Sequence, residues 1–234
     1  ASALQYGGDA IGGIVVIEPE VIKKDTLVGK TILNLSSNGM GGSLSSSLQK
    51  GNRYGWSWNA LGTFKYLGDR ETPDYVLSNS GNREQNFSGG IRYAKEKYNF
   101  NAMYSFYNAQ IGIIKASHIG NVNDLYNSIN NQQPSVIEPF TYSIDAPKQE
   151  VQHHLAKINF QRWLSENTSI YLQYAFQFNN LLDFDVRRTS ATTKKAALDL
   201  QLATHTFLAD YKTVVGNWRL KSGLNLGYQN NFAN

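Results

Sequence analysis

The chain has 234 residues, of which 41% are hydrophobic and 17% are charged, and its 22 basic and 18 acidic residues leave a formal net charge of +4. No apolar run approaches the roughly 20 residues that a membrane-spanning helix needs, and the basic residues are too scattered for a nucleic-acid footprint. The absence of cysteine excludes disulfides and thiolate metal sites. The order of residues must therefore decide the class of protein.

The first 18 residues differ from the rest of the chain because they are rich in glycine. The segment Gly7–Gly13 precedes a short apolar run, Ile14–Ile17. Paired glycines allow positive φ angles and close backbone approach, and Asp9 can bond to the nearby backbone. A phosphate-binding loop would have a helix after its glycines, whereas a strand-like run follows here. A generic turn before a strand is the other interpretation.

From Thr26 onward, apolar and polar side chains alternate with a period of two, which indicates β-strands. The clearest run covers residues 168–178, where Leu172 and Tyr174 oppose Gln173. Nine strands are predicted, at about residues 26–37, 42–50, 56–66, 86–94, 98–108, 151–163, 168–178, 199–211 and 218–228. No convincing helical period separates them, so we expect an antiparallel meander. Their lengths fit a tilted transmembrane strand of about 9–11 residues better than a soluble strand of about five or six.

After the first hairpin, the connections alternate strictly between short and long. The short ones are residues 49–54, 95–97, 164–167 and 213–217, and the long ones are residues 67–85, 109–150 and 181–198. Outer-membrane barrels have tight turns at one rim and long loops at the other. A soluble β-sandwich also alternates apolar and polar positions, but it has no reason to keep its long loops at one end. The pattern therefore favours a membrane barrel.

The two predicted faces of the strands have opposite character. One face carries four or five large apolar side chains per strand, and leaving each exposed to water forgoes about 1.5–3 kcal/mol. Lipid or a second sheet must cover this face. The other face, with Asn99, Lys157, Gln173 and Arg219, is too polar for the interior of a sandwich and suits a wet lumen or a polar plug.

The glycine-rich segment and the strands that follow it resemble a known family, the TonB-dependent outer-membrane receptors. In that family a small-Tyr-Gly-x-Asp/Asn-Ala-hydrophobic-Gly-Gly motif ends the plug domain and leads into the barrel. The motif residues here are Tyr6, Gly7, Asp9, Ala10, Ile11, Gly12 and Gly13. Residues 111–124, 147–157, 184–188 and 199–205 also resemble the Bacteroidetes-type members.

The resemblance implies two parts in the chain. Residues 1–20 would be the C-terminal end of a plug domain. Residues 21–234 would be the N-terminal part of an all-β, antiparallel up-and-down transmembrane β-barrel, with nine of about 22 strands. Because single-chain bacterial barrels normally have an even strand number and must close, we expect the barrel to continue beyond these nine.

The family resemblance also implies a function. The protein would be a multi-pass receptor of the bacterial outer membrane that binds a scarce nutrient, such as an iron chelate, and imports it. Its partners would be outer-membrane lipid, the TonB energy-coupling complex, a small nutrient ligand and, in some members, a surface lipoprotein. The alternatives are a passive porin or adhesin-like barrel and a soluble carbohydrate-binding β protein. No cofactor is implied, and no Ser-His-Asp or paired-carboxylate constellation predicts an enzyme.

Candidate ligand contacts come from the long loops, which in proteins are usually functional or mobile. They are His118, Asn123, Asp124, Tyr126, Tyr142, Arg187 and Arg188. The two arginines could attract a ferric chelate, a carboxylate or a phosphate, and a loop salt bridge with Asp183 or Asp185 is the alternative. We expect no metal site, because adjacent His153 and His154 point to opposite faces of a strand.

Overall fold

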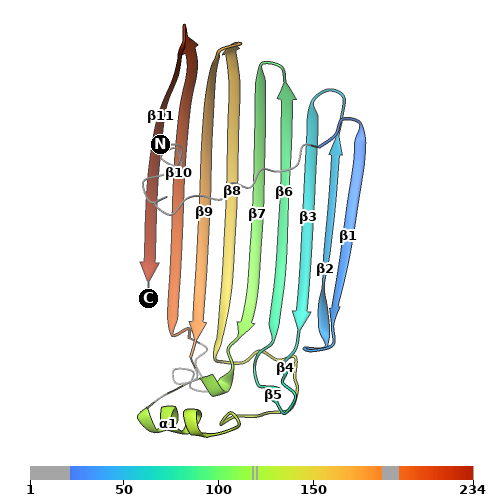
Figure 1. Cartoon of the computed structure of the whole chain (residues 1–234), viewed down its shortest axis with the longest axis vertical. Coiled ribbons are helices and arrows are strands. Elements are labelled where there is room, and N and C mark those ends of the chain that lie inside the picture. Colours follow the sequence, from blue (N-terminus) through green and yellow to red (C-terminus); the bar gives the residue numbers. More distant parts are fainter. Residues whose placement is uncertain (1–21, 118, 120, 186–194, 234) are drawn as a thin grey trace.

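A computed structural model describes residues 22–117, 119, 121–185 and 195–233, and these form one large antiparallel sheet of nine strands (Figure 1). Its strands are β1 (Thr26–Ser36), β2 (Gly41–Gly51), β3 (Trp56–Leu67), β6 (Asn82–Lys95), β7 (Tyr98–Gly112), β8 (Lys148–Ser165), β9 (Thr168–Phe184), β10 (Leu198–Val215) and β11 (Trp218–Ala233). Each strand pairs with its neighbours along the chain, which confirms the predicted meander. The plug-end motif, Tyr6–Gly13, lies outside the described residues.

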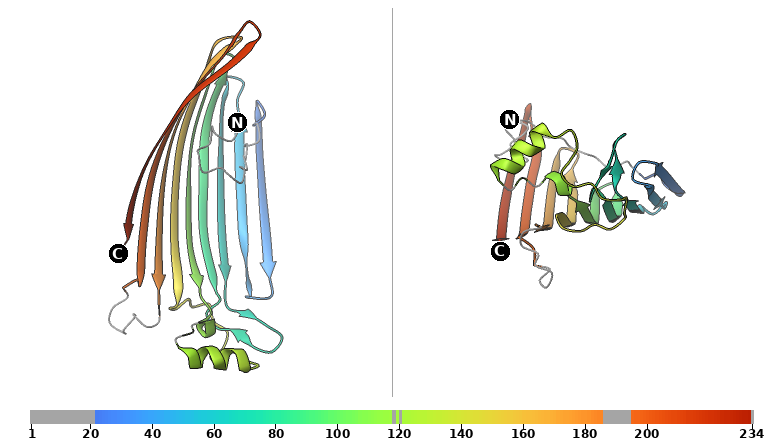
Figure 2. Two further views of the ribbon diagram at one scale, coloured as in Figure 1. Left: turned by 60° about the vertical axis from the view of Figure 1, so that its left-hand side comes forward. Right: turned by 90° about the horizontal axis from the view of Figure 1, so that it is seen from below.

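The sheet is a single curved, twisted layer, and it is not closed, because β1 and β11 do not pair with each other (Figure 2). Among the described residues, the buried hydrophobic side chains are only those of Leu67, Ala109, Ile144 and Ala175. Most large apolar side chains of the strands are exposed on this layer. The fold therefore needs something other than its own core to cover its apolar surface.

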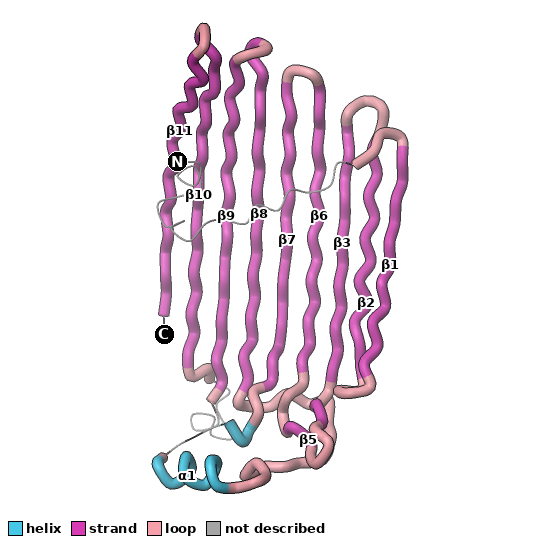
Figure 3. The backbone as a smooth tube through the Cα atoms, in the orientation of Figure 1, coloured by secondary structure: helices cyan, strands magenta, loops and turns pink. Residues whose placement is uncertain are grey.

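The connections show the predicted asymmetry between the two ends of the sheet (Figure 3). At one end, which we call the turn end, the described hairpins β6–β7, β8–β9 and β10–β11 each turn within two residues. Gly216, in the last of these turns, has a φ of +59°, as two-residue hairpins favour. The long connections, residues 68–81, 113–147 and 185–197, all leave the opposite end, which we call the loop end.

Two of the long connections contain secondary structure of their own. In residues 68–81, β4 (Arg70–Glu71) pairs with β5 (Val76–Leu77), and residues 113–147 contain a 3-10 helix, η2 (Lys115–Ser117), and a helix, α1 (Val122–Asn130). The expectation of no helix between the strands is therefore wrong at α1. The Asn121 side chain accepts a hydrogen bond from the backbone N–H of Asp124 and caps this helix.

Within the described part of the chain, no helix has both the length and the apolar character needed to cross a membrane.

Candidate functional site

The register divides the nine-stranded sheet into two chemically different faces, because directly paired residues of antiparallel strands point to the same side. The apolar face carries, among others, Trp58, Phe100, Ile158, Leu172 and Leu224. The polar face carries, among others, Lys65, Asn99, Lys157, Gln173 and Lys221. Both predicted faces are therefore present, most clearly on β3 and on β6 to β11.

The apolar face ends at one continuous row of amide side chains. This amide row runs through directly paired residues of five strands: Gln85, Asn108, Gln152, Asn180 and Gln201. The next row toward the turn end contains Phe87, Phe106, His154, Phe178 and Ala203. The change from aromatic to amide side chains therefore falls at the same level on neighbouring strands.

The apolar face has a second boundary near the turn end. There, one row of paired residues contains Lys95, Tyr98, Arg162, Ile170 and Tyr211. Between this row and the amide row lie four rows dominated by aromatic and aliphatic side chains, which we call the apolar band. On β7 the band is bounded by Tyr98 and Asn108, which are ten residues apart.

The polar face carries charged and hydroxyl pairs between neighbouring strands. Lys65 Nζ lies 2.9 Å from Glu84 Oε1 across β3 and β6, and Lys221 Nζ lies 3.3 Å from Asp210 Oδ2 across β11 and β10. These ion pairs are partly exposed, so each contributes little to stability. In the described ranges no three His, Asp or Glu side chains come close enough to hold a metal ion.

At the loop end, the described residues of connections 68–81 and 113–147 fold together into a unit that we call the loop cap. Asp69 lies at its centre with 0% exposure. Its carboxylate accepts hydrogen bonds from the backbone N–H groups of Ser80, at 2.9 Å, and Thr141, at 3.2 Å. One buried carboxylate therefore joins two connections that are far apart in the sequence.

A second buried side chain in the loop cap, Asn79, fixes the same two connections from another side. Its Nδ2 lies within hydrogen-bond distance of the carbonyl oxygens of Ile113, Asp145 and Pro147, at 2.7 to 3.0 Å, and its two N–H groups are shared among them. Its Oδ1 accepts from the N–H of Asp145 at 2.9 Å. Asn79 has a φ of +67°, a conformation that asparagine tolerates better than most residues. The loop cap is therefore a packed, hydrogen-bonded structure.

Tyr142, one of the candidate ligand contacts, lies on the rim of the sheet. Its hydroxyl donates to the carbonyl of Met40 at 2.7 Å, and its ring stacks on Tyr66 of β3 with centroids 5.2 Å apart. Arg83 Nη2 donates to the Tyr142 carbonyl at 2.7 Å. The side chain of Tyr142 therefore anchors the loop cap to the strands.

Three other candidate contacts, Asn123, Asp124 and Tyr126, lie together on α1. This helix has no buried residue, and Tyr126 is 68% exposed. The structure thus brings these three together on α1, whereas the ring of Tyr142 packs against Tyr66 of β3. The remaining candidates, His118, Arg187 and Arg188, lie outside the described residues.

The alternation pattern did not single out Arg83 as a site residue. The predicted strand began at residue 86, which placed Arg83 in a loop, whereas β6 begins at Asn82. Arg83 therefore belongs to the wall of the sheet, on the apolar face and one row beyond the amide row. The signal was present in the sequence as an arginine four residues before Phe87, where the apolar alternation starts.

No family model matches the chain, and no curated protein matches its sequence.

Proposed function

We propose that the nine-stranded sheet is part of the wall of a β-barrel in the bacterial outer membrane, with the apolar face toward lipid and the polar face toward the lumen. The apolar band carries this proposal. Ten residues on β7 separate Tyr98 from Asn108, which is about 34 Å along the strand. A tilt of about 40° reduces this to about 26 Å, close to the apolar band about 25 Å tall of transmembrane barrels.

The proposal must also account for the open edges of the sheet. Unpaired N–H and C=O groups on β1 and β11 would be costly in lipid, so a spanning sheet must be closed by further strands. In the proposed protein, these nine strands belong to a closed barrel of about 22. The loop end faces the outside of the cell, because outer-membrane barrels keep their long loops there.

We propose further that the barrel is a TonB-dependent receptor with a plug, which binds a scarce nutrient such as an iron chelate and imports it. The support for this step is the resemblance of Tyr6–Gly13 to the end of a plug domain. The TonB complex would supply energy through the plug, and a surface lipoprotein is a further partner at the loop end. The polar face would give the ligand a wet path along the wall.

The two alternatives make different demands on the chain. A soluble carbohydrate-binding β protein would need a second sheet over the apolar band, and the described residues form only the two-stranded β4–β5 sheet besides the large one. A passive porin or adhesin-like barrel fits the sheet equally well. Only the plug-end motif distinguishes the importer from it.

Cell fractionation and uptake test the two levels of the proposal separately. In cells that express the protein, we expect it in the outer membrane after a urea wash, and we expect extraction only with detergent. A folded, monodisperse species in buffer without detergent would contradict the membrane wall. For import, uptake of a panel of radiolabelled ferric chelates should be lost in cells without TonB. Uptake that is independent of TonB would indicate the passive porin.

A further inference from the structure

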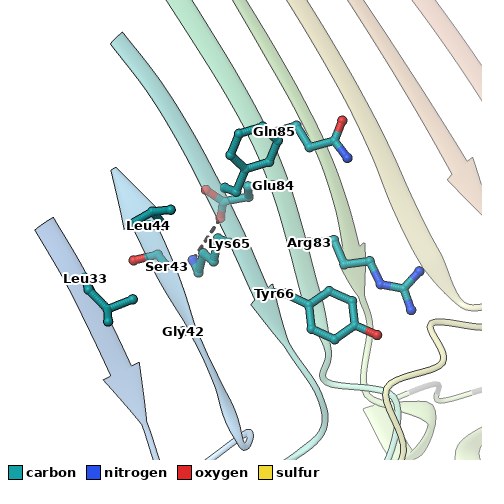
Figure 4. Close-up of a pocket in the computed structure, with 10 residues that line it drawn as sticks. Leu33, Gly42, Ser43, Leu44, Lys65, Tyr66, Arg83, Glu84 and Gln85 are labelled. Carbon is teal, nitrogen blue, oxygen red and sulfur yellow. Dashed lines mark hydrogen bonds and ion pairs between the residues drawn. The ribbon is translucent and has the colours of Figure 1, made fainter. Parts of the chain in front are cut away.

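A groove of about 410 Å³ lies on the apolar face near the loop end, between β1, β2, β3 and β6 (Figure 4). Its apolar lining consists of Leu33, Leu44, Phe64 and the ring of Tyr66. Toward the turn end it continues into a second hollow of about 270 Å³, which shares Leu44 and Phe64 with it. The two hollows adjoin each other on the surface that we propose faces lipid, and together we call them the rim groove.

Small side chains form the floor of the rim groove. Ser46, Ala60 and Gly62 lie between the larger Leu48 and Phe87. A Cβ atom built on Gly62 would have no heavy atom within 4 Å, so the space above it is open. From Tyr66 to Ala60 the groove follows β3 for six residues, about 20 Å. At a tilt of about 40° its depth is about 15 Å, half of the roughly 30 Å hydrocarbon core.

The loop end of the rim groove carries one positive charge, the guanidinium of Arg83. It lies over the Tyr66 ring, 5.1 Å from the centroid, and it donates to the Tyr142 carbonyl. Its Nε is buried and has no hydrogen-bond partner. The neighbouring Glu84 points to the polar face, where it pairs with Lys65. Within the described residues, no carboxylate forms an ion pair with Arg83.

We propose that the rim groove holds one membrane lipid with an anionic phosphate headgroup, its phosphate on Arg83 and its acyl chain along the small-residue floor. Guanidinium groups bind phosphate well, and this one belongs to a partly exposed side chain, has no carboxylate partner among the described residues and lies beside an apolar groove about one leaflet deep. The inference rests on the proposed membrane wall. It adds a specific lipid site to a surface that would otherwise contact lipid nonspecifically.

The test measures which lipid lies in the groove. The chain has no cysteine, so Leu35→Cys gives one labelling site; Leu35 is 79% exposed and pairs with Gly42, which lines the groove. The protein carries a bimane label there, in phosphatidylcholine nanodiscs that contain either brominated phosphatidic acid or brominated phosphatidylcholine. We expect brominated phosphatidic acid to quench the bimane with a several-fold higher apparent affinity than brominated phosphatidylcholine at equal mole fraction.

Two substitutions should remove this preference, and each has a matched control. Arg83→Gln removes the charge, and Arg162→Gln does the same at the turn-end boundary of the apolar face. Gly62→Leu adds a side chain to the floor of the groove, and Gly227→Leu adds the same side chain to the polar face of β11; at both positions a Cβ atom has no heavy atom within 4 Å. We expect loss of the preference in Arg83→Gln and Gly62→Leu and no change in the two controls.

The possible outcomes distinguish a failure of the proposed lipid site from a failure of the proposed membrane wall. Equal quenching by both lipids in the unsubstituted groove would overturn the lipid site and leave the wall intact, because lipid still reaches the label. A preference that survives Gly62→Leu would also overturn it, and this variant keeps the contact between Arg83 and the loop cap. An absence of quenching by either lipid would instead contradict the proposed membrane wall.

Discussion

The hydroxyl of Tyr104 on β7 lies 2.7 Å from Nδ1 of His154 on β8, diagonally across the apolar face. Tyr174 on β9 and His205 on β10 repeat this pair at the same distance. A phenylalanine ring centroid lies 4.9 Å from each imidazole. The two histidines are one and two rows from the amide row, on the loop-end half of the apolar band.

We expect the Tyr174–His205 pair to be energetically coupled. Removing one partner leaves the other without its hydrogen bond on an apolar surface, whereas removing both restores a wholly apolar contact. A double-mutant cycle of Tyr174→Phe and His205→Phe should give about 0.5–1 kcal/mol of coupling, measured by urea unfolding in bilayers. The unbonded combination Tyr104→Phe with His205→Phe is the control and should be additive. Equal coupling in both cycles would show that the hydrogen bond is not responsible.

Asp69→Ala should open the loop cap while the sheet stays folded. The substitution leaves the buried N–H groups of Ser80 and Thr141 without an acceptor, at a cost of about 1–3 kcal/mol each. Amide hydrogen exchange at these two residues should accelerate at least tenfold, and exchange in β7 to β9 should not change. Asp74→Ala is the matched control, because Asp74 is exposed in the same connection. Unchanged exchange in Asp69→Ala would mean that other contacts hold the cap.

Helix α1 should depend on its cap and not on its apolar stripe. Asn121→Ala removes the N-cap acceptor and should cost about 1 kcal/mol of helix stability, seen as faster amide exchange in α1. Ile129 is 71% exposed, so Ile129→Ser should change the free energy of unfolding by less than about 0.5 kcal/mol. A much larger loss in Ile129→Ser would show that another part of the assembly covers this side of the helix.

The strand pattern predicted the middle of each strand better than its loop end. The predicted strand 168–178 began at the right residue, but β9 continues to Phe184. Beyond Phe178 the pattern fails because the apolar face ends at the amide row, and both faces are then polar or mixed. Backbone pairing continues past this boundary, since it does not depend on the side chains. Alternation therefore locates the apolar band and not the ends of the strands.

The loop cap shows what sequence reasoning could and could not find. The stripe Val122, Leu125, Tyr126 and Ile129 has helical spacing after an asparagine cap, so α1 was predictable from its own residues. The role of Asp69 was not, because its acceptor bond to Thr141 joins residues 72 positions apart. Contacts of this kind depend on how two loops meet above the sheet. No local pattern contains that information.

The sharpest test of the two faces uses neighbouring residues in the middle of β8. Ile158 is 48% exposed on the apolar face, near the centre of the band, and Asn159 lies on the polar face between Asn101 and Gln173. In a bilayer, Ile158→Arg should cost about 2–4 kcal/mol, because it places a charge near the midplane. Asn159→Arg should cost less than about 1 kcal/mol. Urea unfolding of the bilayer-embedded protein measures both.

The cost of a charge on the apolar face should also depend on depth. Gln152 lies on the same strand and the same face as Ile158, but in the amide row, so Gln152→Arg should cost only about 0–1 kcal/mol. An apolar face that stays in water predicts a different result, because arginine at a half-exposed position in water is tolerated about equally well at all three sites. Equal, small effects at Ile158, Asn159 and Gln152 would therefore refute the membrane wall. A graded series, largest at Ile158, would also place the amide row at the outer edge of the hydrocarbon.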